Sequence, residues 1–131
     1  MRLKNKQIIN IYENLKNSFN DNTKYFPAKI NFLIQKNGLI LREVVEMIYD
    51  CRDRIIKEYG VADSQDSEKY IIKEQYRDSA QKELDELLDL EQDISLFKIP
   101  FTNIENLEFT SNQMEAIMFM IEEENQEDQV E

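Results

Sequence analysis

The side chains best suited to chemistry in this sequence are carboxylates, and they crowd into one short stretch of its second half. Glu83 with Glu86, and Glu86 with Asp89, have the (i, i+3) spacing that places side chains on one face of a helix. Carboxylates grouped in this way bind divalent cations or the basic surface of another protein. The candidates for partner binding in this cluster are Glu83, Glu86, Asp89, Glu91 and Asp93.

Metal and catalytic uses of these acids lack the residues that usually accompany them. The chain has no histidine, whereas di-metal carboxylate bundles add Glu-x-x-His motifs. A calcium loop places alternating Asp or Asn around a central glycine, and no such pattern occurs. The single cysteine, Cys51, has no histidine to activate it. The only glycines, Gly38 and Gly60, build no phosphate loop. We therefore expect a protein that is not an enzyme, with no catalytic residue, metal site or cofactor, although a metal-binding or enzymatic use of the clustered carboxylates stays open.

The charge of the chain is distributed unevenly. Residues 1–60 carry 11 basic and 7 acidic side chains, whereas residues 61–131 carry 5 basic and 20 acidic ones, which together give the net charge of −11. Such an acidic chain repels nucleic-acid phosphates, so direct nucleic-acid binding is not expected. Clustered carboxylates instead favour a protein partner with a basic surface.

The composition favours long helices in a cytoplasmic protein. Two glycines and two prolines are too few for the many turns of an all-β fold. No segment approaches the roughly 20 apolar residues of a membrane span, so no membrane association is expected. Apolar spacing predicts a helix over residues 3–19 and a long helix from Pro27 to Gly60, with Gly60 as a left-handed cap. A polar connection over residues 61–68 follows, and residues 70–72 are either a short strand or the start of the next helix. From about Asp78 a second long helix forms an antiparallel hairpin with the first.

The remaining elements complete an α+β fold that is predominantly α. Period-two alternation over residues 94–101 predicts an edge strand, and residues 106–110 could pair with it as a small two-stranded β-ribbon. Residues 1–124 are predicted to form a single globular domain. Residues 125–131 are predicted to be an acidic disordered tail by composition.

A methionine-rich helix over residues 110–124 closes the domain. Thr110 followed by Gln113 fits the capping box that begins a helix. Phe119 and Met120 fall outside its main apolar stripe, so this helix either packs inside the core or presents a docking surface. Both interpretations stay open. The candidate docking residues here are Phe119, Met120, Glu122, Glu123 and Glu124.

Several stretches in this order resemble a family of small proteins of unknown function from tailed bacteriophages. They are LKNKQIINIYENL near the start, FPAKINFLIQKN and RDRIIKEYG around the long helix, and residues 83–122 near the end. The resemblance spans nearly the whole chain. Phe26 and Glu58 depart from the leucine and the lysine usual at those positions. The resemblance implies an accessory role in the cytoplasm of an infected bacterium, and it carries over no catalytic residue.

Together these features predict a non-catalytic accessory protein that acts by binding another protein. One role is inhibition of a host defence or nucleic-acid-handling protein through the acidic surface. The alternative is a virion-assembly or structural accessory protein. Self-association through the helical hairpin or the terminal helix is a further expectation.

Overall fold

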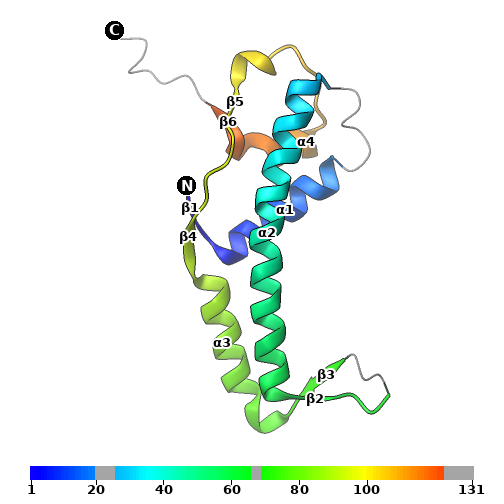
Figure 1. The fold of residues 1–131 in the computed structure, drawn as a ribbon, viewed down its shortest axis with the longest axis vertical. Coiled ribbons are helices and arrows are strands. Elements are labelled where there is room, and N and C mark those ends of the chain that lie inside the picture. The colour runs from blue at the N-terminus through cyan, green and yellow to red at the C-terminus, as the bar shows by residue number, and fades with distance from the viewer. Residues whose placement is uncertain (20–25, 66–68, 123–131) are drawn as a thin grey trace. The chain divides into compact units, whose positions relative to one another are not determined.

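A computed structural model describes residues 1–19, 26–65 and 69–122, and these residues form a mostly helical α+β fold (Figure 1). The predicted fold class is confirmed at this level. The residues group into two compact units. Unit 1 comprises residues 1–9 and 43–94, and unit 2 comprises residues 10–42 with those from 95 onward. The single domain over residues 1–124 stays a prediction, and the predicted tail, 125–131, lies outside the described residues.

The long helix α2, Ala28–Tyr59, contributes to both units. Its 32 residues span about 48 Å at 1.5 Å per residue. Gly38 does not interrupt it, because tertiary packing outweighs the weak helix propensity of one glycine. The predicted helix is therefore confirmed as one continuous element. Its buried residues recur every three or four positions, at Ile30, Ile34, Asn37, Leu41, Val45 and Ile48.

The chain leaves α2 through a β-hairpin in unit 1. Strand β2, Gly60–Ala62, pairs antiparallel with β3, Tyr70–Ile72. The left-handed cap predicted at Gly60 is wrong, since no described glycine has a positive φ. Glycine is required there for a different reason. A Cβ at this position would lie 2.6 Å from the carbonyl oxygen of Ile56 and 3.2 Å from that of Ile71.

Helix α3, Arg77–Asp89, follows this hairpin after the 3-10 turn Glu74–Tyr76. Of the two alternatives for residues 70–72, the structure shows the short strand. Its partner β2 was not predicted, because those residues were assigned to the polar connection. The helix α3 lies beside the end of α2, where the Tyr59 and Tyr76 rings are 6.0 Å apart between centroids.

The N-terminus completes unit 1. Strand β1, Arg2–Lys4, pairs antiparallel with β4, Glu91–Asp93, and helix α1 then begins at Asn5 and ends at Ser18. Leu3 thus lies in a strand and not in the predicted helix. The Asn5 side chain is buried. Its Nδ2 donates to the Leu87 carbonyl (2.8 Å) and its Oδ1 accepts from Gln92 Nε2 (2.6 Å). This amide joins the start of α1 to the end of α3.

In unit 2 the strand pairing differs from the prediction. Strand β5, Ile99–Pro100, pairs with β6, Ile121–Glu122, and the pair is parallel. Residues 106–110 are not its partner. A buried amide, Asn37, holds the segment before β5. Its Oδ1 accepts from the Phe97 N–H (2.7 Å), and its Nδ2 donates to the Phe97 carbonyl (2.9 Å) and to Met120 Sδ (3.2 Å). The side chain of Asn37 therefore satisfies both backbone groups of Phe97.

Helix α4, Ser111–Ile117, begins with the predicted capping box. Thr110 Oγ1 accepts from the Gln113 N–H (3.1 Å), and Gln113 Oε1 accepts from the Thr110 N–H (3.0 Å). Gln113 Nε2 also donates to the Ser18 carbonyl at 3.2 Å. The helix ends earlier than predicted, because a 3-10 turn, Met118–Met120, redirects the chain into β6.

Loss of this cap is expected to weaken unit 2 modestly. The substitution Thr110→Ala should lower the free energy of unfolding by about 1 kcal/mol, since it removes the acceptor of the Gln113 N–H. Urea denaturation followed by circular dichroism measures the change. The exposed neighbour Ser111 provides the control, and Ser111→Ala should shift the midpoint less than Thr110→Ala. Equal shifts would contradict a capping role for Thr110.

Candidate functional site

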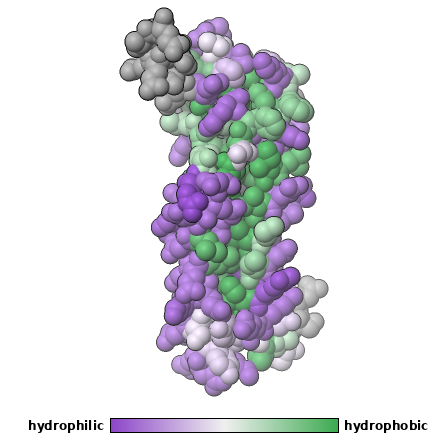
Figure 2. All heavy atoms as spheres, turned by 60° about the vertical axis from the view of Figure 1, so that its left-hand side comes forward, coloured by the Kyte–Doolittle hydropathy of each residue, from purple (hydrophilic) through white to green (hydrophobic). Residues whose placement is uncertain are grey.

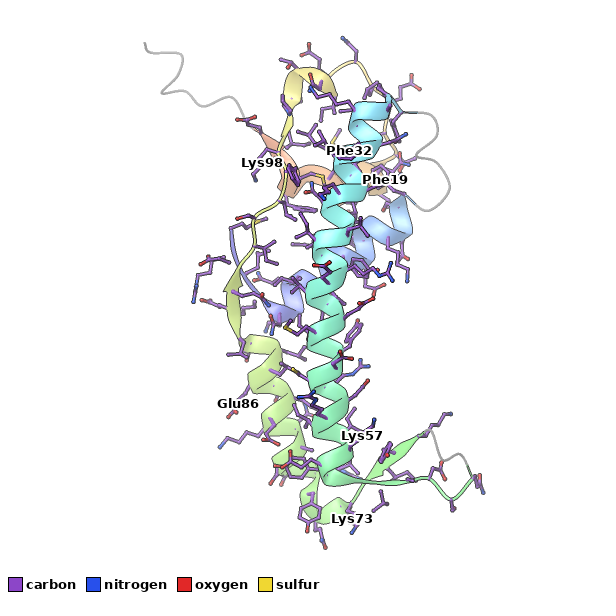
Figure 3. All side chains as sticks on the ribbon, in the orientation of Figure 1. Phe19, Phe32, Lys57, Lys73, Glu86 and Lys98 are labelled. Carbon is purple, nitrogen blue, oxygen red and sulfur yellow. The ribbon has the colours of Figure 1, made fainter. Side chains whose placement is uncertain are left out.

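The candidate site is the outer face of α3 in unit 1. The inner face packs through buried Ala80 and half-buried leucines, while Glu86 points away from α2 (Figure 3). Figure 2 turns the side of α3 toward the viewer and shows exposed hydrophobic residues next to hydrophilic ones. The outer face bounds an open hollow of about 730 Å³. The residues that line this hollow are Asp78, Gln81, Lys82, Asp85, Glu86, Asp89 and Leu90.

Three of the predicted partner-binding acids pair with the basic N-terminus of the same chain. Lys6 Nζ lies 3.0 Å from Asp89 Oδ1, while Arg2 lies 3.0 Å from Glu91 Oε2 and 3.5 Å from Asp93 Oδ2. The hydrogen bond from Lys6, together with its charge, lowers the pKa of Asp89. The pairing of β1 with β4 brings these groups together. Part of the charge asymmetry of the sequence is therefore satisfied inside unit 1.

Glu83 belongs to the inner contacts of α3 and not to its outer face. The Tyr59 hydroxyl hydrogen-bonds its carboxylate, and this bond, burial, and the charges of Glu83 and Glu58 raise the pKa of Tyr59 to about 12. Glu83 Oε2 is also buried, and it has no hydrogen-bond partner among the described residues. This burial agrees with an inner position of the side chain. Glu83 therefore connects α3 to the end of α2 through its hydrogen bond with Tyr59, and it is a poor candidate for binding a partner.

The Tyr59 contact predicts a titration at high pH. Because the folded-state pKa is raised above the ordinary value of about 10, the contact stabilises the fold fully below pH 10. That stabilisation is lost as the pH rises through about 12. The ultraviolet absorbance of tyrosinate should show one tyrosine titrating near pH 12, and Tyr59→Phe should remove it. The substitution Glu83→Gln should bring this titration to a lower pH, whereas Glu86→Gln on the outer face should leave it in place. A late titration that survives Glu83→Gln would contradict the assignment.

The acids of the outer face that remain available are Asp78, Asp85 and Glu86. Glu86 is exposed and has no ion pair with any described residue. Asp85 accepts one hydrogen bond from Gln81 Nε2 at 2.9 Å. Leu90, at the end of the same face, is 59% exposed. The structure thus brings Glu86 together with Asp85, a member of the same acidic stretch of the sequence, and with Asp78, which the sequence had not singled out.

The two units differ in net charge, and the acidic outer face of α3 lies in the more acidic unit. The described residues of unit 2 carry five basic and five acidic side chains and are neutral. Those of unit 1 carry ten basic and fourteen acidic side chains, a net charge of −4. The rest of the net charge of −11 belongs to residues outside the described ranges. Within the described residues, the excess of acidic over basic side chains therefore belongs to unit 1.

The described C-terminal candidates belong to unit 2. Met120 is fully buried in unit 2 and bonded to Asn37, so its prediction as a docking residue is wrong in this fold. Phe119 is half-buried, and its carbonyl accepts from Lys98 Nζ at 3.2 Å. Glu122 is exposed in β6, and Glu123 and Glu124 lie outside the described residues. Met118 is 64% exposed.

No group of three or more potential ligands among the described residues could hold a metal ion. Within the same residues, every helix is too short or too polar to cross a membrane. Comparisons with protein-family models, curated proteins and solved structures give no match.

Proposed function

We propose that this chain is a non-catalytic accessory protein that binds a basic surface of another protein through the outer face of α3. The observation that carries the proposal is that Asp78, Asp85 and Glu86 lie on one open face of α3. Lys82 lines the same face. None of the three acids forms an ion pair with a described residue. Complementary potentials of this kind accelerate association and set the orientation of the complex.

An exposed apolar side chain supplies the second element of a docking surface. Leu90 lies on the acidic face itself and is 59% exposed. An apolar anchor surrounded by charged groups is the usual arrangement of a protein interface. A basic amphipathic surface therefore fits this part of unit 1 better than a purely polar one.

The biological setting of the proposal rests on the sequence resemblance to small proteins of tailed bacteriophages. In the cytoplasm of an infected bacterium, an acidic binding protein would inhibit a basic host protein, such as a defence or nucleic-acid-handling protein. An assembly role in the virion is the alternative, and it would use the same face on a basic structural protein. Self-association through this face is disfavoured, because like charges would meet.

The proposal is tested by affinity capture from infected cells with three versions of the chain as bait. The double substitution Asp85→Lys/Glu86→Lys reverses two charges on the outer face of α3. The matched control, Glu105→Lys/Glu108→Lys, makes the same change at two exposed acids of unit 2. We expect the α3 variant to bind the captured protein at least about tenfold more weakly, which corresponds to about 1.4 kcal/mol. The control should keep the affinity of the original chain. Equal affinities of the two variants would overturn the assignment to α3.

A further inference from the structure

Gly38 is an unexpected residue for the middle of α2. Glycine destabilises a helix interior relative to alanine, and no described glycine has a positive φ that would require it. Packing does not require it either. If a Cβ were added at Gly38, its nearest neighbour would be Leu15 Cδ2 at 3.8 Å, an ordinary van der Waals distance. Gly38 is therefore needed neither for the backbone conformation nor for the contact between the two helices.

What the missing side chain does provide is space in a groove. Gly38 lines an open groove of about 420 Å³ between α1 and α2 in unit 2. Its apolar surface comes from Leu15 on α1, from Phe19 directly after α1, and from Ile34 and Leu39 on α2. Phe19 is labelled at the end of α1 in Figure 3. Leu39 is 54% exposed. Volumes of this size are typical of small-molecule sites, which are mostly apolar with a few polar groups.

The charged groups of the groove are cationic, and its other polar residues, Tyr12 and Gln35, are uncharged. Lys16 and Arg42 line it, and no carboxylate does. This is notable in a chain with a net charge of −11. Lys16 forms no ion pair with a described residue. A ligand that buries an apolar body in the groove would therefore meet a positive charge at its edge, and a negative end group is favoured there.

We propose that the groove between α1 and α2 binds a small amphiphilic carboxylate, with its hydrocarbon part over Gly38 and its carboxylate beside Lys16. The apolar lining favours the hydrocarbon part, and the positive charge of Lys16 favours an anionic end group. Because Gly38 has no side chain, the space above it stays open to the ligand. This site is separate from the acidic face of α3, and it does not depend on the function proposed for that face.

The test uses decanoate and decyltrimethylammonium, which share a hydrocarbon chain and differ in the sign of the charge. Nuclear magnetic resonance titration of the full chain, below the micelle concentration of each compound, should show decanoate shifting the amide signals of residues 12–19 and 34–42. Decyltrimethylammonium should bind at least about tenfold more weakly, about 1.4 kcal/mol. Equal binding of both compounds would indicate unspecific adsorption and overturn the proposal, as would no binding of decanoate.

Three variants locate the ligand. The substitution Lys16→Glu should weaken decanoate binding at least about tenfold. Lys36→Glu changes another exposed lysine of unit 2 that does not line the groove, and it should leave the affinity unchanged. Gly38→Ala should weaken binding while raising the thermal midpoint of unfolding, which separates loss of the site from loss of the fold. Equal weakening by the two lysine variants, or full affinity in Gly38→Ala, would overturn the proposed site. Binding of an acidic peptide in place of decanoate would do so as well.

Discussion

Replacing Asn37 by leucine is expected to lower the free energy of unfolding by about 2–4 kcal/mol. The leucine fills nearly the same volume but leaves the N–H and the carbonyl of Phe97 without their partners, which now lie 2.7 and 2.9 Å away. It also removes the contact with Met120 Sδ. Both hydrogen bonds to Phe97 are part-buried, and a buried polar group left unpaired costs about 1–3 kcal/mol. Urea denaturation monitored by circular dichroism measures the loss.

A second asparagine in unit 2 provides the control. Asn14 is exposed on α1, so Asn14→Leu makes the same chemical change without removing a buried hydrogen bond. We expect this variant to stay within about 0.5 kcal/mol of the original chain. If Asn37→Leu behaved in the same way as Asn14→Leu, the clamp on Phe97 would contribute nothing to stability.

The substitution Gly60→Ala is expected to lower the free energy of unfolding by about 1–3 kcal/mol. The added Cβ would lie 2.6 Å from the carbonyl oxygen of Ile56 and 3.2 Å from that of Ile71. These are backbone atoms, so the end of α2 and the β2–β3 hairpin must move apart to accommodate it. Thermal and urea unfolding measure the loss, and amide hydrogen exchange should show the largest increase in residues 56–72.

The other glycine of the chain makes an informative comparison because the expected sign is opposite. Gly38→Ala adds the same methyl group where the nearest atom is 3.8 Å away. It should raise the free energy of unfolding by about 0.5–1 kcal/mol, the usual advantage of alanine over glycine inside a helix. Stabilisation by both alanines would show that the close approach at Gly60 is absent in solution.

The sequence located the acidic cluster on a helix but did not reveal the partners of its members. The spacing of Glu83, Glu86 and Asp89 placed them correctly on α3, because a helix has a fixed period. It did not reveal that Asp89 meets Lys6 or that Glu83 meets Tyr59. Those partners come from distant segments, and local spacing carries no information about them. Of the predicted cluster, only Glu86 keeps the role of an available carboxylate.

Elements that depend on near neighbours could be predicted from the sequence alone. The periodicity of apolar residues located the continuous helix Ala28–Tyr59, and Thr110 with Gln113 located the start of α4. Interactions within a few residues produce both signals, so they can be recognised in the linear chain. The boundaries failed where a strand from elsewhere competed, as at Ile121–Glu122, which pairs with β5.

The hydrogen-bond partners of the buried amides are known only from the folded structure. Asn5 bonds the carbonyl of Leu87, Asn37 bonds both backbone groups of Phe97, and Gln113 reaches the carbonyl of Ser18. The bonded residues are between 60 and 95 positions apart along the chain. Buried polar groups must find hydrogen-bond partners, but the choice of partner depends on which segments the hydrophobic core brings together. In the sequence, an asparagine such as Asn37 among apolar residues indicates low helix propensity. In the folded protein, its side chain binds the backbone of a distant segment, here at Phe97.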